Sequence, residues 1–196
     1  MADFKSSETK INLMRAFAGE SQARNRYTFA ANAAEKEKLH VVSAVFKFTA
    51  EQEKEHAEVF YGLLGEAAGE SIRIDGSYPT DIDSSAAKLL RMAQHNELEE
   101  YNDVYRAFAE TARREGFDKI GLTFENIAEI EKTHAERFAK FAELLEDGQL
   151  FVSDVDCAWM CLNCGHVLEG KAAPEICPVC GHNRGWFIRF ALAPMS

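Results

Sequence analysis

Apolar residues recur every three or four positions along most of residues 7–146, the spacing that gives an α-helix one buried face. The pattern falls into four segments. We expect the first helix to begin after Ser6 or Ser7 and end in the mid-thirties, and the others to span about 40–65, 84–116 and 117–146. The prolines at 79, 174, 178 and 194 leave these segments uninterrupted, so long helices are permitted.

The connections between the segments differ in length. Short turns join the first helix to the second and the third to the fourth, whereas residues 66–83 contain Gly69, Gly76 and Pro79 and form a long crossover. Two helix hairpins joined by one crossover have ferritin-like topology. We therefore predict a mainly α protein in which residues 1–148 form a ferritin-like four-helix bundle.

The helical period disappears after Gly148. Residues 149–154 are predicted to be a linker, and residues 155–196 are short segments broken by glycine and proline. So short a module cannot be held together by an apolar core alone. We predict a small β/loop domain that is stapled by a metal ion.

A repeat within the bundle carries the first candidate chemistry. Residues 50–60 and 128–138 are identical at eight of eleven positions. A lone glutamate precedes each copy, 33 residues earlier in the first case and 34 in the second. Each half therefore contributes one Glu and one Glu-x-x-His, a set that makes a carboxylate-bridged two-metal site when four helices present it inward. The residues are Glu20, Glu53 and His56 in the first half and Glu97, Glu131 and His134 in the second.

The alternative interpretation is that these glutamates are solvated, as most helical glutamates are. This interpretation fits the acids that lie outside the apolar faces of the helices. We expect these acids to be exposed, and they are Glu51, Glu55, Glu58, Glu99, Glu129 and Glu136. The repeated acids instead lie in register with Phe and Leu, where an unpaired carboxylate is costly. Solvation explains neither the register nor the repetition. Carboxylates with two imidazoles suit Fe or Mn better than zinc or copper.

The two halves suggest a division of roles. Glu53 and Glu131 would bridge two metals, each of which a histidine of the repeat would cap. Glu20 and Glu97 would be terminal ligands. Glu100, one turn beyond Glu97, is a surplus carboxylate that could exchange with another ligand.

Two tyrosines lie about two turns from the terminal carboxylates. Tyr27 and Tyr105 could donate hydrogen bonds to the ligand carboxylates, and the alternative for each is simple core packing.

The second candidate site lies in the C-terminal module. Cys161-x-x-Cys164-Gly is followed, after twelve residues, by Cys177-Pro-Val-Cys180-Gly, so four thiolates can surround one ion. The spacing alone favours structural zinc over an electron-transfer iron. Cys157 lies outside both pairs and is predicted to be a free thiol. We expect His166 and His182 to be exposed loop residues and assign no role to His40 or His95.

Composition limits the partners and the compartment. The net charge is −10, which argues against binding nucleic acid or an anionic membrane. No secretory signal and no apolar run of membrane-spanning length is visible, so we expect a cytoplasmic protein. All five cysteines fall within residues 157–180, and in a reducing compartment such a cluster favours a metal site over disulfides.

With both sites identified, the chain resembles a rubrerythrin over nearly its whole length. The resemblance rests on residues 18–27 (Ala-Gly-Glu-Ser-Gln-Ala-Arg-Asn-Arg-Tyr), the two Glu-x-x-His pairs, residues 97–103 (Glu-Leu-Glu-Glu-Tyr-Asn-Asp) and the paired cysteine motifs. It implies a non-haem di-iron centre and a rubredoxin-like domain with one iron. The family reduces hydrogen peroxide to water with electrons from NAD(P)H through separate carriers, which implies a role against oxidative stress and an external donor such as a rubredoxin or its reductase.

The resemblance also implies a ligand set and an assembly. It reverses the zinc preference at the cysteines and implies that one iron moves between His56 and Glu100 as its oxidation state changes. It implies a head-to-tail homodimer or larger assembly. The di-iron ligands would be Glu20, Glu53, Glu97, Glu100, Glu131, His134 and, in the reduced state, His56.

Two other functions compete with peroxide reduction. Ferroxidation with iron storage uses the same bundle but gives the cysteine module no role. A zinc-ribbon interaction protein with a vestigial bundle has no need of the repeated carboxylates.

Overall fold

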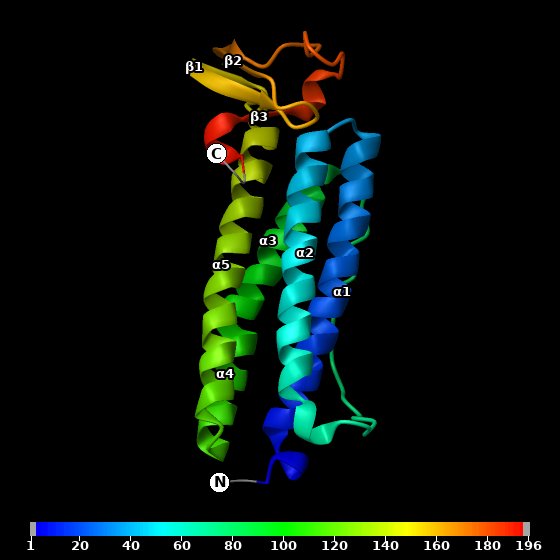
Figure 1. Cartoon of the computed structure of the whole chain (residues 1–196), viewed down its shortest axis with the longest axis vertical. Helices are drawn as coiled ribbons and strands as arrows, with labels where there is room; N and C mark the ends of the chain where they lie inside the picture. The colour runs from blue at the N-terminus through cyan, green and yellow to red at the C-terminus, as the bar shows by residue number, and fades with distance from the viewer. Residues whose placement is uncertain (1–2, 194–196) are drawn as a thin grey trace.

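The computed structural model describes residues 3–193 and shows a long helical bundle with a small β-sheet at one end (Figure 1). The predicted mainly α fold is confirmed. None of the helices in the described part combines the length and the apolar character needed to cross a membrane. The helices are α1 (Glu8–Lys36), α2 (His40–Leu63), α3 (Ala86–Glu99), α4 (Tyr105–Glu115) and α5 (Asp118–Glu146).

The connections give the predicted ferritin-like topology. Short turns join α1 to α2 and α4 to α5, and each pair packs as a helix hairpin (Figure 1). The long crossover between Leu63 and Ala86 contains one short 3₁₀ turn, Gly65–Ala67, and otherwise runs without regular structure. This connection carries the chain back along the bundle so that the second hairpin can pack against the first.

Two side chains cap the start of α1, and one of them comes from the distant end of α4. The Ser7 hydroxyl accepts a hydrogen bond from the Lys10 amide at 3.1 Å at the start of α1. The Glu115 carboxylate, at the end of α4, also accepts from the amides of Glu8 and Thr9 at 3.0 and 2.8 Å. Gly116 then ends α4 with φ 88°, a left-handed conformation that favours glycine. One turn of chain thus stops α4 and fastens it to α1.

The predicted third helix is present, but it is not a regular α-helix throughout. A π-helical segment, Glu100–Val104, separates α3 from α4. Its wider turn rotates the following residues around the helix axis. Val104 is accordingly 36% exposed, whereas Tyr105 and Ala109 are buried.

The apolar core of the bundle has two parts, with the repeated carboxylates and histidines between them. The part nearer the sheet contains Phe46, Leu90 and Phe138, and the other contains Leu13, Phe60 and Phe124. The predicted exposed acids are confirmed as solvent-facing, and they are Glu51, Glu55, Glu58, Glu99, Glu129 and Glu136.

The small domain is a three-stranded antiparallel sheet in the order β2-β1-β3. The strands are β1 (Val152–Cys161), β2 (Val167–Ala172) and β3 (Phe187–Arg189). Trp159 and Phe187 pack with two of the cysteines in a separate core, and the indole N–H of Trp159 donates to the Gly170 carbonyl at 2.9 Å. So little apolar material agrees with the need for a metal staple.

The sheet domain is closely fitted to the end of the bundle. A Cβ atom on Gly185 would lie 1.8 Å from the carbonyl oxygen of Lys38, so no side chain fits there. His40 stacks on Trp186 with 4.4 Å between ring centroids, a contact that the sequence did not reveal. Arg189 donates to the carbonyl of Gln149 at 2.8 Å.

Glu115→Ala tests the link between α4 and α1. We expect the free energy of unfolding at pH 7 to fall by about 1 kcal/mol, the usual cost of removing a helix cap. Burial alone would raise the pKa of Glu115, but the hydrogen bonds from Thr9 and Glu8 outweigh burial and lower it. The stabilisation is therefore present above the ordinary glutamate pKa and is lost as the pH falls through the lowered value.

Chemical denaturation at several pH values measures this effect. Glu110→Ala, on the exposed surface of α4, is the control and should leave stability nearly unchanged. Equal stability of Glu115→Ala and the parent at pH 7 would contradict the cap.

Candidate metal centres

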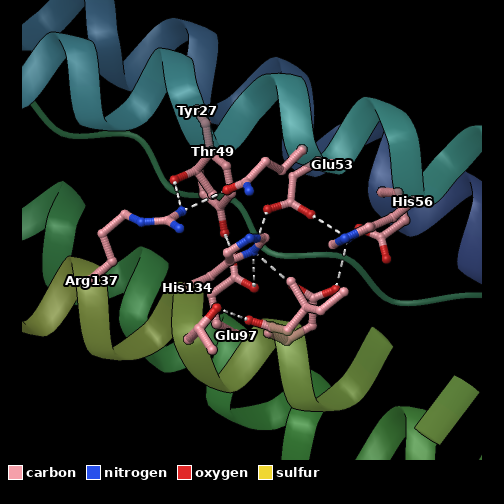
Figure 2. Close-up of polar contacts among 12 residues, drawn as sticks. Tyr27, Thr49, Glu53, His56, Glu97, His134 and Arg137 are labelled. Atoms are coloured by element: carbon pink, nitrogen blue, oxygen red, sulfur yellow. Dashed lines mark hydrogen bonds and ion pairs between the residues drawn. The ribbon is translucent and has the colours of Figure 1, made fainter. Parts of the chain in front are cut away.

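Four helices bring the repeated residues together in the middle of the bundle. The carboxylates are at most 1% exposed and the two histidines at most 7%. They form two overlapping groups whose candidate donor atoms lie within 4.8 Å of one another. Figure 2 shows Glu53 and His56 of one hairpin facing His134 of the other. One group is Glu20, Glu53, His56 and Glu131, and the other is Glu53, Glu97, Glu131 and His134.

Two carboxylates belong to both groups, because each faces both histidines. Glu53 Oε2 lies 3.1 Å from Nδ1 of His56, and Glu53 Oε1 lies 2.9 Å from Nδ1 of His134 (Figure 2). Glu131 repeats the arrangement, at 2.9 Å from His56 and 2.8 Å from His134. This geometry is that of carboxylates spanning two adjacent cation positions.

The cluster leaves buried polar atoms unsatisfied. Atoms of Glu20, Glu53, Glu97, Glu131 and His134 have no hydrogen-bond partner among the described residues. Several of them lie at ion-pair distance from one another, but without hydrogen-bond geometry. Orphaned carboxylate oxygens and imidazole nitrogens in one buried layer are donor atoms suited to cations.

The pKa values show the same demand for positive charge. Burial alone would lower the pKa of His134, but Glu131 and Glu53 outweigh it and raise the pKa to about 12. The pKa of His56 is likewise raised to about 9 against the effect of burial. Burial and the charge of Glu53 raise the pKa of Glu97 to about 8. Protons therefore balance the carboxylates wherever metal cations do not, and metal uptake must displace them.

Two tyrosine hydroxyls are tied to the cluster in a reciprocal way. Tyr27 on α1 donates to Oε1 of Glu97 on α3, and Tyr105 on α4 donates to Oε1 of Glu20 on α1. Each tyrosine thus orients the carboxylate of the opposite hairpin. Simple core packing, the alternative interpretation, does not describe these contacts.

Glu100 occupies a different position from the other four acids. It is half-buried, begins the π-helical segment and belongs to neither four-residue group. Burial and the neighbouring charge of Glu97 still raise its pKa well above the ordinary value, so its carboxyl lies in the field of the cluster. The structure therefore places Glu100 beside the cluster and not within it.

A polar network next to the cluster was not predicted. Arg26 Nη1 lies 2.5 Å from Asp81 of the crossover, and Asn96 of α3 donates to the same carboxylate at 2.7 Å. The network fastens the crossover to α1 and α3. Because Asp81 lies in a segment without periodicity, only the folded chain reveals its partners.

Arg137 makes further contacts near the cluster that the sequence did not predict. It lies one turn beyond His134 on α5 and donates to the side chains of Thr49 and Gln52 on α2 at 2.9 and 2.8 Å (Figure 2). Burial lowers its pKa against the opposing effect of the carboxylates. The sequence did give one signal for Arg137: it lies three residues after His134, on the same side of the helix.

The four paired cysteines converge in the small domain. Cys161 and Cys180 have sulfur atoms 3.8 Å apart, and those of Cys164 and Cys177 are 3.7 Å apart. A tetrahedral ion with metal–sulfur bonds of about 2.3 Å requires sulfur separations of about 3.8 Å. The thiolates are thus spaced for one ion.

Each cysteine pair forms the same backbone turn. The amide of Gly165 donates to the Cys161 carbonyl at 2.8 Å, and the amide of Gly181 donates to the Cys177 carbonyl at 3.0 Å. Both glycines are left-handed, with φ 75° and 73°. Cys157 is a free thiol, as predicted.

The expectation for His166 and His182 is wrong, because both are half-buried. His182 packs edge-on against Trp186, with 5.1 Å between ring centroids.

This fold and these donor sets define a ferritin-like bundle with a two-metal carboxylate centre and a four-thiolate module. A family model described as "Rubrerythrin" matches residues 12–142, and one described as "Rubrerythrin, rubredoxin-like domain" matches residues 159–188. The chain belongs to the rubrerythrin family. Its carboxylate–histidine cluster is accordingly a di-iron site and its four cysteines a rubredoxin-like iron site.

Similar proteins agree with this assignment along the chain. Rubrerythrin from Porphyromonas gingivalis is 46% identical over 183 residues, which cover 93% of this chain and 90% of the relative. Rubrerythrin from Nitratidesulfovibrio vulgaris is 38% identical, with 95% and 96% covered. A solved structure of nigerythrin described as fully reduced and all ferrous has a TM-score of 0.63 at 28% identity, covering 93% of this chain and 86% of that chain.

Metal content provides the first test of the ligand assignment. Protein reconstituted anaerobically with excess iron should hold three irons per chain, two in the carboxylate cluster and one at the cysteines. Iron uptake by the cluster should release protons and weaken as the pH falls, since both histidines are protonated at neutral pH when no metal is bound. Elemental analysis and calorimetry in buffers of different ionisation enthalpy measure both effects.

Zinc uptake by the same protein is the matched comparison. It should show the same proton release, because the release depends on the ligands and not on redox chemistry. A chain that stops at one metal ion would contradict the assignment.

Proposed function

We propose that this protein reduces hydrogen peroxide to water, H₂O₂ + 2H⁺ + 2e⁻ → 2H₂O, and thereby protects against oxidative stress. The observation that carries the proposal is the pair of carboxylates, Glu53 and Glu131, each of which faces both histidines. They support two adjacent metal positions, and the same chain carries a one-ion thiolate site. A two-metal site can give peroxide two electrons, and a one-ion site can return electrons one at a time. The combination of the two sites therefore fits peroxide reduction.

The residues that would hold the two irons are the members of the cluster. Glu53 and Glu131 would bridge, His56 and His134 would each cap one position, and Glu20 and Glu97 would be terminal ligands. Glu100 would supply a further carboxylate from the edge of the cluster. Two ferrous ions held there would supply two electrons and Lewis acidity.

The surrounding side chains keep the ligands in place and hold protons. Burial, together with the charge of Glu97, raises the pKa of Tyr27 well above its ordinary value. Burial and Glu20 do the same for Tyr105. Both hydroxyls therefore stay protonated and keep donating to the carboxylates that they orient. The apolar clusters on either side exclude bulk water from this layer.

The cysteine module would return electrons one at a time. The backbone amide of His182 lowers the pKa of Cys180 to about 6, which favours the thiolate that binds iron. The electrons would come from an external donor linked to NAD(P)H, such as a rubredoxin or its reductase, in the reducing environment of the cytoplasm.

Electron transfer between the two kinds of site would require a second chain. The module sits at the end of the bundle (Figure 1), while the cluster lies between the two apolar parts of the bundle core. A head-to-tail pair of chains would bring one module to the partner's cluster. Iron storage would leave this module without a role, and that favours peroxide reduction over ferroxidation.

Replacing two cysteines separates the sites. Cys161→Ser combined with Cys164→Ser should remove the thiolate iron and its colour while the bundle, which has its own core, stays folded. Peroxide should still oxidise the reduced cluster once in stopped-flow measurements. Steady turnover with an external reductase should collapse.

Cys157→Ser, outside the thiolate group, is the matched control and should turn over normally. Unchanged steady turnover of the double variant would show that the module is not the electron relay.

Glu100→Gln tests the carboxylate at the edge of the cluster. The six other residues remain, so two metals should stay bound. Oxidation by peroxide should slow because ferric iron, the harder ion, is stabilised by an anionic oxygen ligand. A loss of roughly 2–3 kcal/mol in the transition state corresponds to roughly 30- to 150-fold.

Glu99→Gln is the control, since that side chain is exposed. Stopped-flow oxidation of both variants at matched metal content gives the comparison. An unaltered rate for Glu100→Gln would remove this residue from the rate-limiting chemistry.

A further inference from the structure

A cavity of about 570 Å³ lies beside the metal cluster. Its walls come from α1, from the tip of the crossover and from the π-helical segment with the start of α4. The lining includes Gly19, Gln22, Ser77, Tyr78, Glu100 and Tyr105. The function proposed above leaves this space without a role.

The inner wall of the cavity is part of the cluster's own surroundings. Tyr105 lines the cavity and also donates its hydroxyl hydrogen bond to Glu20. Glu100 lines the cavity as well, and its carboxyl lies in the electrostatic field of the cluster. A small molecule in this space is therefore separated from the candidate ligands by the side chains that contact them.

One polar group on the wall lacks a partner. Arg26 Nε donates to Oε1 of Gln22 at 2.6 Å, which fixes the orientation of the Gln22 amide. This leaves Nε2 of Gln22 as a buried donor with no acceptor among the described residues. A guest with an acceptor oxygen would satisfy it.

The crossover contributes the Tyr78 ring to the cavity lining. The ring of Tyr78 lies against α1, where a Cβ added to Gly19 would be 3.7 Å from it, and the Tyr78 hydroxyl donates to the Arg15 carbonyl at 3.2 Å. Carboxylates of Asp75, Glu99 and Glu100 also line the cavity. Arg15 is the cation among its lining residues, and it is paired with Asp75 at 2.5 Å. An acidic lining disfavours anions. The Tyr78 ring on the wall leaves less room for a bulky guest than a smaller side chain would.

We propose that this cavity is the route by which small, uncharged hydroperoxides reach the metal cluster, and that Tyr78 limits their size. The inference rests on the proposed peroxide reduction and adds the route and the size limit of its substrate. A neutral peroxide passes the acidic lining, offers Gln22 an acceptor oxygen and arrives at Glu100 and Tyr105. A bulky hydroperoxide is stopped at the Tyr78 ring.

Blocking the cavity from two sides tests the route. Gly19→Leu fills it from α1, at a helical position without left-handed backbone, and Gly19→Ala is the matched control. Because Gly19 adjoins Glu20, Ser77→Trp provides a second block from the crossover, which carries no candidate ligand. Thr80→Trp, exposed and outside the lining, is its control.

At parental metal content, both blocking variants should be oxidised by hydrogen peroxide about tenfold or more slowly in stopped-flow mixing, and both controls about as fast as the parent. A parental rate in either blocking variant would overturn the route.

Opening the cavity tests the size limit. Tyr78→Ala should raise the ratio of the oxidation rate with cumene hydroperoxide to the rate with hydrogen peroxide about tenfold. Tyr61→Ala removes an exposed ring from α2, outside the cavity lining, and should change neither rate. A ratio of the two rates that does not respond to Tyr78→Ala would overturn the size limit.

Crystals of the iron-loaded protein under xenon pressure give a readout independent of turnover. Xenon should occupy the cavity in the parent and be absent from it in Gly19→Leu. If hydrogen peroxide does not oxidise the reduced parent, the proposed function fails, and a cavity without xenon would separately refute the route.

Discussion

The structure depends on placing four carboxylates in the middle of a helical core. Each would be costly to bury alone, and two imidazoles cannot neutralise all of them. This layer therefore requires additional positive charge, and the apolar clusters on either side exclude bulk water from it. The tyrosine hydroxyls, which donate across the two hairpins, hold the carboxylates in place without adding charge. The buried carboxylates are the residues least compatible with an apolar core, and they are also the ligands that the metal ions require.

The two halves of the bundle are nearly equivalent, and the π-helical segment breaks the equivalence. Glu20 and Tyr27 are seven residues apart, whereas Glu97 and Tyr105 are eight apart. The wider turn absorbs the additional residue, so that Tyr105 faces the cluster as Tyr27 does. It also begins with Glu100, which has no counterpart in the first half. The segment thus preserves the paired tyrosines while it adds one acid at a single edge of the cluster, next to the cavity.

Sequence periodicity was sufficient for much of this molecule. It located the helices, the short turns and the crossover, because buried faces repeat at the helical period. The repeated Glu-x-x-His pairs identified residues that the structure does bring together. The π-helical segment was missed, although the unequal spacing of the tyrosines was visible, since a single additional residue barely disturbs an apolar stripe. Contacts of Asp81, and of His40 with Trp186, were out of reach, because they join segments whose encounter only tertiary structure determines.

The fit of Gly185 against the Lys38 carbonyl has a mechanical consequence. Together with the stacked His40 and Trp186 rings, it makes the sheet domain a rigid extension of the bundle and not an arm on a flexible tether. A tethered carrier can search for its acceptor by swinging, and its rate is then set by the length of the tether. A rigidly mounted carrier cannot search, so its rate depends on how often another surface meets it in the correct orientation. In the head-to-tail pair proposed above, that orientation would be set by how the two chains dock, so lengthening the segment between Glu146 and Val152 would be a poor way to speed electron delivery.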